Sequence, residues 1–274
     1  MQDSAATRDL TPAELASYAA QGFLAVEDLV SPAECRELRA EAARICRGTY
    51  PIRGIEPIPP DAGDDEAMGR YLCVHQPHKV SPVMFRYCGH PRIARALSQL
   101  IGPNVKCMQS MLFLKPPGFP GQAYHQDERY IPTEDRTLTG AWIALDDATI
   151  ENGCLWVVPG SHRGPILPWA KHDNPEYDFA EEAQGVPREQ EAPLPCRAGA
   201  VLFFHGHLLH SSRRNRSASF RRVLVNHYMS AESRLRWQGK DDYRDVFVVH
   251  GTDPHAELGY EDLALPHLRA VGSR

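Results

Sequence analysis

Short β-rich runs follow one another between residues 103 and 250, and they restrict the fold more than any other feature of the sequence. The runs are VKCMQSMLFLK, LTGAWIALDDA, GCLWVVPGSH, GAVLFFHGH, RRVLVNHYM and DVFVVHG, and turn-forming residues separate them. Many short strands at such intervals are typical of an antiparallel sandwich or jelly roll. We therefore predict a mainly β fold with flanking α-helices, built on a double-stranded β-helix (jelly roll, cupin-like) core.

The residues before this region predict helices around a short strand. Thr11 and Ser31 are each followed by proline and, three residues on, by glutamate, which is the pattern of a capped helix start. GFLAVEDLV between them is a plausible strand, and another helix is expected over about residues 91–101. Residues 51–66 are predicted to be a loop, because prolines, glycines and acids occur there without periodicity.

These patterns favour one domain over residues 1–274. It would have a helical N-terminal part at about 11–102, the jelly-roll core at about 103–250 and a C-terminal tail at 251–274. A chain of 274 residues with 42% hydrophobic residues can bury one substantial core.

Charge and hydropathy narrow the choice of partners. The net charge is −5 with both signs interspersed, so no basic stripe for nucleic acid and no polybasic membrane patch is evident. No apolar run approaches the ~20 residues of a membrane span, and the opening MQDSAATRDLTPAE has no secretory pattern. We predict a small-molecule substrate, no nucleic acid and no membrane, and leave the oligomeric state open.

Cysteine usage indicates a reducing compartment. The seven cysteines are odd in number and form no C-x-x-C pair, which favours neither a zinc knuckle nor a complete disulfide framework. The expected location is cytoplasmic.

The most informative local pattern is His125-Gln126-Asp127. Side chains two residues apart on an extended segment point the same way, so His125 and Asp127 could bind one metal ion. The strand GAVLFF precedes His205, His207 and His210, and metal chemistry alone leaves open which of them is the third ligand. Two histidines and one carboxylate on one face of an octahedral ion leave three open positions, as in non-haem Fe(II) oxygenases.

Arg221 favours His210 as that third ligand. It follows His210 by eleven residues, and a hairpin through SSRRNRSAS would bring it back near the His210 strand. A guanidinium there could clamp a carboxylate with two parallel hydrogen bonds. The alternative is a surface arginine that pairs with an acid. Arg222 would point to the opposite face, toward solvent.

Longer segments carry a resemblance to a known family. HQDERYIP, GAWIALDDATIENGCLWVVPGSHRGP and GAVLFFHGHLLHSSRRNRSASFRR, with the opening LTPAELASYAAQGFLAVEDLVSPAEC, resemble the phytanoyl-CoA dioxygenase family of Fe(II)/2-oxoglutarate oxygenases. The resemblance implies a dioxygenase that uses O2 to hydroxylate an unactivated C–H bond of a small molecule, releasing succinate and CO2. It also implies that His125, Asp127 and His210 bind Fe(II).

The resemblance further implies a pocket for 2-oxoglutarate as co-substrate. Arg221 matches the residue that binds its far carboxylate, Ser212 matches a hydroxyl that assists, and the residues expected to line the pocket are Gln126, Met111 and Trp142. For Met111 and Trp142, core packing is an equally good explanation. His205 and His207 are further candidates for the pocket or its surroundings.

One departure from the family concerns the substrate. A lysine that the phytanoyl-CoA enzyme places upstream has no clear equivalent in YLCVHQPHKV, where His75, His78 and Lys79 are the nearest polar residues. This departure bears more on whether the substrate is an acyl-CoA than on the chemistry of the reaction.

Candidate substrate residues are His75, His78, Arg129 and Tyr130. Arg129 could instead pair with Glu128 or Glu134. The long polar segment 163–195 is either a lid over the site or a solvated insertion.

Two other functions are compatible with the pattern. One is a non-catalytic jelly-roll protein that binds metal and 2-oxoglutarate, and the other is a cupin-like enzyme that uses another metal such as manganese or zinc. Related halogenases replace the carboxylate ligand with a small residue, so an intact Asp127 favours hydroxylation or desaturation.

Overall fold

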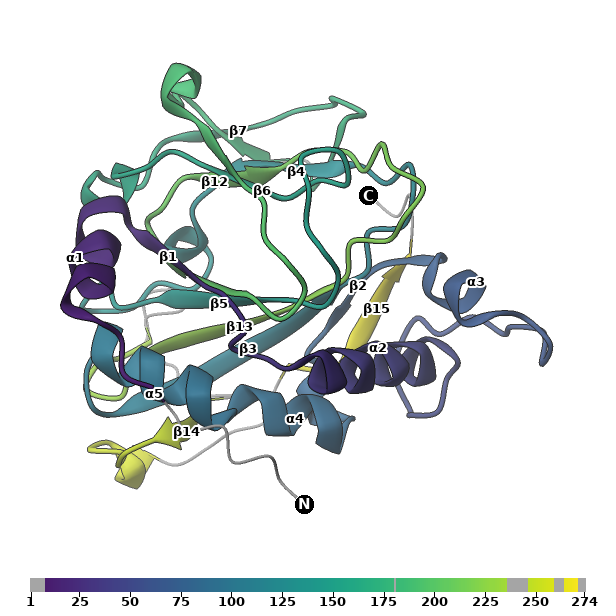
Figure 1. Ribbon diagram of the computed structural model, residues 1–274, viewed down its shortest axis with the longest axis horizontal. Coiled ribbons are helices and arrows are strands. Elements are labelled where there is room, and N and C mark those ends of the chain that lie inside the picture. Colours follow the sequence, from purple (N-terminus) through teal and green to yellow (C-terminus); the bar gives the residue numbers. More distant parts are fainter. Residues whose placement is uncertain (1–7, 180, 236–245, 259–263, 271–274) are drawn as a thin grey trace.

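Two β-sheets face each other, and helices cover the outer side of the larger one (Figure 1). The computed structural model describes residues 8–179, 181–235, 246–258 and 264–270. The mainly β, jelly-roll prediction is confirmed by this architecture.

The larger sheet has the strand order β1-β11-β5-β13-β3-β2-β15, and β14 also pairs with β3. The smaller sheet has the order β10-β6-β12-β4-β8, and β7 pairs with β9 alone. The strands are β1 Phe23–Val26, β2 Tyr71–His75, β3 Val105–Phe113, β4 Gly121–His125, β5 Thr139–Ala144, β6 Leu155–Val157, β7 Trp169–Lys171, β8 Tyr177–Asp178, β9 Glu181–Ala183, β10 Ala192–Leu194, β11 Val201–His205, β12 His210–Ser212, β13 Val223–Ser230, β14 Phe247–His250 and β15 His267–Ala270.

The predicted helix starts are confirmed. Thr11 and Ser31 each accept a hydrogen bond from the backbone N–H of the glutamate three residues on, and that glutamate bonds back to the cap. Such a cap contributes about 1 kcal/mol to helix stability. The α-helices are α1 Pro12–Gln21, α2 Pro32–Cys46, α3 Asp64–Met68, α4 Pro82–Cys88 and α5 Pro91–Leu100, and the short 3-10 turns are η1 Pro77–Lys79, η2 Asp127–Arg129, η3 Ser161–Arg163, η4 Arg188–Gln190 and η6 Ala256–Leu258.

The largest core lies between the helices and the outer face of the larger sheet. Strand alternation divides β13 between this core and the space between the sheets: Leu224 and Tyr228 pack toward the helices, and Val223 and Val225 pack toward the smaller sheet. Burying each such aliphatic side chain stabilises the fold by roughly 1.5–3 kcal/mol. The inner face of β13 therefore looks directly into the space where a ligand can bind.

Two expectations about the ends of the chain need correction. The N-terminal region supplies the expected short strand as β1 and also a strand that was not expected, β2, to the larger sheet. Its predicted loop ends three residues early because α3 begins at Asp64. The expected C-terminal tail contains β15, which pairs with β2. β2 shows no period-2 pattern in the sequence, because it is buried on both faces.

Segment 163–195 folds onto the smaller sheet (Figure 1). Within it β8 pairs with β4 in parallel, β7 pairs with β9, and β10 adds to the edge of the sheet beside β6. The described residues of the segment are therefore joined to the smaller sheet by strand pairing.

Across the described residues, no helix combines the length and the apolar character that a membrane crossing requires. All seven cysteines are free thiols, and six of them are buried.

Candidate active site

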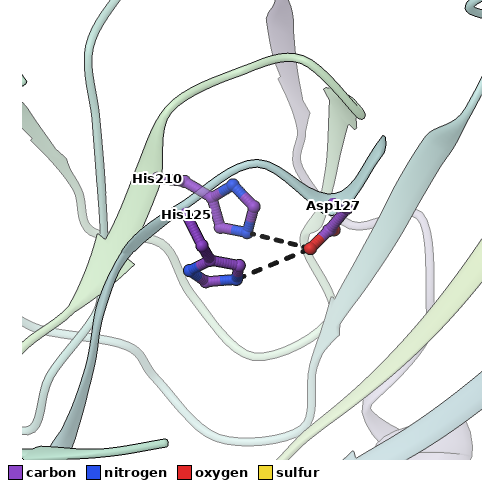
Figure 2. A group of neighbouring side chains, drawn as sticks. All are labelled: His125, Asp127 and His210. Carbon is purple, nitrogen blue, oxygen red and sulfur yellow. Dashed lines mark ion pairs between the residues drawn. The ribbon is translucent and has the colours of Figure 1, made fainter. Parts of the chain in front are cut away.

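Three side chains converge between the sheets. His125 ends β4 and His210 begins β12, and the two residues face each other in the antiparallel register of these strands. Asp127 follows in η2, so its carboxylate turns back toward both rings (Figure 2). The Asp127 Oδ1 atom lies 3.5 Å from His125 Nε2 and 3.7 Å from His210 Nε2. All three ligand atoms fall within 4.8 Å of one another.

Hydrogen bonds orient both imidazoles for metal binding. The Nδ1 of His125 lies 2.8 Å from the carbonyl of Ala123, and the Nδ1 of His210 lies 2.9 Å from the carbonyl of Leu208. Because a carbonyl only accepts, each Nδ1 carries the proton and each Nε2 keeps its lone pair. Burial and the neighbouring His210 lower the pKa of His125 to about 4, which keeps this ring neutral near pH 7.

His227 on β13 holds the other oxygen of the carboxylate. Its Nε2 lies 2.9 Å from Asp127 Oδ2, so Oδ1 stays directed at the two histidines. Burial alone would raise the pKa of Asp127, but the imidazoles of His210 and His227 outweigh it, and the pKa of this carboxyl is lowered. A permanently ionised carboxylate is what a divalent metal requires.

This donor set fits Fe(II). Two neutral imidazole nitrogens and one carboxylate oxygen on one side of a cavity match the 2-His-1-carboxylate arrangement, whose open positions face away from the protein ligands. The hydrogen bonds that orient all three ligands are the support such sites use.

The ligands open into a cavity of about 550 Å³ between the sheets. Its size is within the range of small-molecule sites. We call its buried lining the deep end, which includes Trp142, Leu155, Phe204, Ser212, Arg221 and Val225. We call its partly or fully exposed lining the outer part, which includes His75, Gln109, Met111, Tyr130, Lys171, Phe179, Glu181 and Arg269.

Arg221 is a buried cation at the deep end. Its side chain is only 4% exposed, and its guanidinium lies 5.5 Å from the centre of the Trp142 ring. Among the described residues it has no carboxylate partner, and its Nε atom has no hydrogen bond. Burial lowers the pKa of Arg221 to about 10, so it is still charged near neutral pH. A buried charge without a partner marks a place for an anionic ligand.

The predicted hairpin between His210 and Arg221 is wrong. β12 pairs with β4 and β6 in the smaller sheet, whereas β13, which follows Arg221, pairs with β3 and β5 in the larger one. The segment between them crosses from one sheet to the other. His210 and Arg221 share the cavity because their sheets face each other, not because their strands pair.

Four of the five expected co-substrate residues line the cavity, Arg221 among them, and one does not. Met111, Trp142 and Ser212 form part of its wall. Gln126 lies on the opposite side of its segment from His125 and Asp127. Its amide donates to the carbonyls of Pro165 and His207 and accepts from the N–H of Leu167, so it anchors the start of segment 163–195.

The expected substrate residues also divide into two groups. Tyr130 and His75 line the cavity. His78 lies outside it, with its Nδ1 2.6 Å from the Ser110 hydroxyl, because η1 turns its side chain into the protein. Arg129 also lies outside it and pairs at 2.8 Å with Glu181, not with Glu128 or Glu134.

The remaining sequence candidates have structural partners elsewhere. His205 and His207 lie outside the cavity, and His207 contacts the guanidinium of Arg136. Arg222 is not a solvent residue, because it forms a two-point ion pair with Asp146 on the outer side of the sheet.

The sequence analysis missed several residues of the cavity, and two of them matter for its chemistry: His227 and Lys115. His227 could have been found, because alternation along the apolar run RRVLVNHYM puts it on the same face of β13 as Val225, and both line the cavity. Lys115 also lines the cavity and is 3% exposed. The only signal for it is a lysine at the end of an apolar run.

Comparison with known proteins settles the family. The model of the family described as "Phytanoyl-CoA dioxygenase (PhyH)" matches residues 18–223, which include every candidate ligand. The chain belongs to the phytanoyl-CoA dioxygenase family. Family membership and the metal site together make the protein an Fe(II)/2-oxoglutarate-dependent dioxygenase, with O2 as the oxidant.

Two relatives named phytanoyl-CoA dioxygenase match most of this chain. The peroxisomal phytanoyl-CoA dioxygenase of Rattus norvegicus is 32% identical over 229 residues, covering 78% of this chain and 67% of that protein. The phytanoyl-CoA dioxygenase of Arabidopsis thaliana is 27% identical over 269 residues, covering 86% and 94%.

Solved structures share the fold. The epimerase SnoN, crystallised with Fe3+, alpha ketoglutarate and nogalamycin RO, has a TM-score of 0.65 and 26% identity and covers 83% of this chain and 86% of its own. EvdO2 from Micromonospora carbonacea var. aurantiaca, complexed with 2-oxoglutarate, has a TM-score of 0.64 and 24% identity and covers 82% and 93%.

Proposed function

We propose that this dioxygenase hydroxylates an unactivated C–H bond of a small organic molecule and releases succinate and CO2. The observation that carries the proposal is the placement of the His125, Asp127 and His210 ligand atoms at the wall of one cavity that also contains Arg221. A metal-bound co-substrate and a substrate could therefore meet in one enclosed space.

The deep end of the cavity suits 2-oxoglutarate. Fe(II) and 2-oxoglutarate, when bound, supply an oxidant able to break an unactivated C–H bond. Arg221 would hold the far carboxylate, and Ser212 would donate to it. The apolar walls formed by Leu155, Phe204 and Val225 exclude water from this end, which strengthens each charge-assisted hydrogen bond there.

The outer part of the cavity suits a substrate with an apolar body and polar groups. Met111 and Phe179 offer apolar contact, and His75, Gln109 and Tyr130 offer hydrogen bonds. Since the cavity of about 550 Å³ must also contain the co-substrate, only part of this volume is open to the substrate, which limits it to a small molecule.

Segment 163–195 would help to determine which molecule is accepted. It contributes Lys171, Phe179 and Glu181 to the outer wall, and the Arg129–Glu181 ion pair ties it to the turn that carries Asp127. Residues of this segment therefore touch the substrate while the metal ligands stay on the smaller sheet.

Retention of Asp127 favours hydroxylation over halogenation, because the carboxylate occupies the position that a halide would need. The similarity to an epimerase makes epimerisation a second outcome to test, since it too begins at a C–H bond. Incorporation of ¹⁸O from ¹⁸O2 into the product would support hydroxylation, and solvent hydrogen exchange at carbon without ¹⁸O would favour epimerisation.

The first experiment is anaerobic titration of the metal-free protein with Fe(II) and then 2-oxoglutarate, following the visible metal-to-ligand charge-transfer band. Arg221→Ala should weaken 2-oxoglutarate binding strongly. Arg222→Ala is the matched control, because this neighbouring arginine lies outside the cavity and pairs with Asp146. Folded wild-type protein that gives no band would contradict the proposal, and a band would justify screening substrates by succinate release.

A further inference from the structure

Two buried cations lie side by side at the deep end of the cavity. Lys115 is 3% exposed and Arg221 is 4% exposed, and the backbone N–H of Arg221 donates to the carbonyl of Lys115 at 3.1 Å. Within the described part of the chain, neither side chain forms an ion pair with a carboxylate. Two like charges buried together are costly unless an anion joins them.

The partners of the Lys115 ammonium are neutral. Its Nζ atom donates to the Ser212 hydroxyl at 3.0 Å and to the carbonyl of Arg213 at 2.5 Å. Burial, and then the nearby Arg221, lower the pKa of Lys115 well below its usual value. An anion bound beside Lys115 would favour its charged form.

Ser212 is consequently left with one hydrogen bond to make. Its oxygen accepts from Lys115 Nζ at 3.0 Å and from the backbone N–H of Gln122 at 3.2 Å. These two bonds use both acceptor positions of a hydroxyl, so the remaining interaction must be donation of its own proton. Among the described residues no acceptor receives that proton, and Ser212 lines the cavity.

The fold reserves space for this arrangement. A Cβ atom on Gly153 would lie 2.8 Å from Lys115 Nζ and 2.4 Å from the Arg213 carbonyl oxygen. These two atoms are the donor and the acceptor of one hydrogen bond. Gly153 also has a φ of +87°, where other residues are strained. The glycine in the ENGCLW turn thus admits the lysine ammonium to the cavity wall.

We propose that Lys115 is a positioning residue of the co-substrate site, which holds Ser212 as a donor-only hydroxyl directed at the carboxylate that Arg221 binds. This inference rests on the proposed function, since the carboxylate is the far end of 2-oxoglutarate. Lys115 acts on the end of the co-substrate that is remote from the metal. Its contribution is therefore specific to ligands that carry a second carboxylate.

The test compares two ligands on each variant loaded anaerobically with Fe(II). 2-Oxoglutarate has both carboxylates, whereas 2-oxobutyrate has the same chelating end and no second carboxylate. Loss of a hydrogen bond to a charged group changes affinity about tenfold or more. We expect Lys115→Met to raise the Kd of 2-oxoglutarate by about that factor and to leave the Kd of 2-oxobutyrate unchanged.

Two further variants separate this role from a structural one. Lys106→Met removes another buried lysine, 2% exposed and paired with Asp253 outside the cavity, and should leave both affinities unchanged. In a Ser212→Ala background, Lys115→Met should weaken 2-oxoglutarate binding much less than in the wild type, because the lysine acts through Ser212. Unchanged 2-oxobutyrate binding shows in each case that the site is folded.

The outcomes distinguish this inference from the function on which it rests. Wild-type protein that does not bind 2-oxoglutarate would overturn the proposed function itself. Wild-type binding with equal 2-oxoglutarate affinity in Lys115→Met would overturn only the role of Lys115. Equal loss of both ligands would also overturn it, and a full loss in the Ser212→Ala background would refute action through Ser212.

Discussion

The hydrogen bond from His227 to Asp127 should set the metal affinity of this enzyme. His227→Phe keeps a ring of similar size on the inner face of β13 but removes the donor that lies 2.9 Å from Oδ2. Because the bond is made to an ionised and buried carboxylate, its loss should cost about 1.5–3 kcal/mol. The carboxylate would also lose the contact that keeps Oδ1 directed at His125 and His210.

That free energy corresponds to a loss of roughly 10–100-fold in metal affinity, as for other residues that support a metal ligand. Anaerobic titration with Fe(II), and with Co(II) as a spectroscopic substitute, would measure it. His207→Asn is the control, because it alters another buried histidine that contacts Arg136 and no metal ligand. Metal affinity of His227→Phe within twofold of wild type, with the control unchanged, would refute the reasoning.

Further variants test other parts of the site. Asp127→Ala should abolish succinate release and lower Fe(II) affinity, and full activity would remove Asp127 from the ligand set. Glu181→Gln breaks the ion pair between Glu181, 30% exposed, and Arg129, 21% exposed. We expect a loss of less than about 1 kcal/mol of stability but faster proteolysis within segment 163–195. Unchanged cleavage would show that this ion pair does not hold the segment in place. Gly153→Ala should lower the free energy of unfolding by about 1–2 kcal/mol through backbone strain alone, and by more through the contact with the Arg213 carbonyl. Urea unfolding indistinguishable from that of the wild type would show that the turn relaxes without cost.

Local chemistry explains which predictions succeeded. The starts of α1 and α2 depend on residues three positions apart, and both were predicted from the caps at Thr11 and Ser31. His125 and Asp127 point the same way because of strand alternation, which is also local. A larger pattern, the succession of short β-rich runs, was enough to predict a jelly roll.

The failures concern which strands pair. Arg221 was expected beside His210 through a hairpin, but short sequence separation does not say whether a strand stays in its sheet or crosses to the facing one. Gln126 and His78 were misplaced because a polar side chain near a site can equally well hold a loop or a buried hydroxyl. Lys115 was missed because its partner, the Ser212 hydroxyl, is 97 residues away.

The cavity wall is formed by parts of the chain that differ in how tightly the fold constrains them. The iron ligands lie on or directly beside paired strands of the smaller sheet, where Gly121 packs so closely on Ser212 that a Cβ atom would lie 1.9 Å from its carbonyl oxygen. By contrast, Phe179 comes from segment 163–195, and Arg269 comes from β15 at the edge of the larger sheet. Mutations in segment 163–195 and β15 can accumulate without disturbing the iron ligands, so new substrates could evolve on an unchanged catalytic centre. Exchanging both segments together between relatives is the natural way to transfer substrate selectivity.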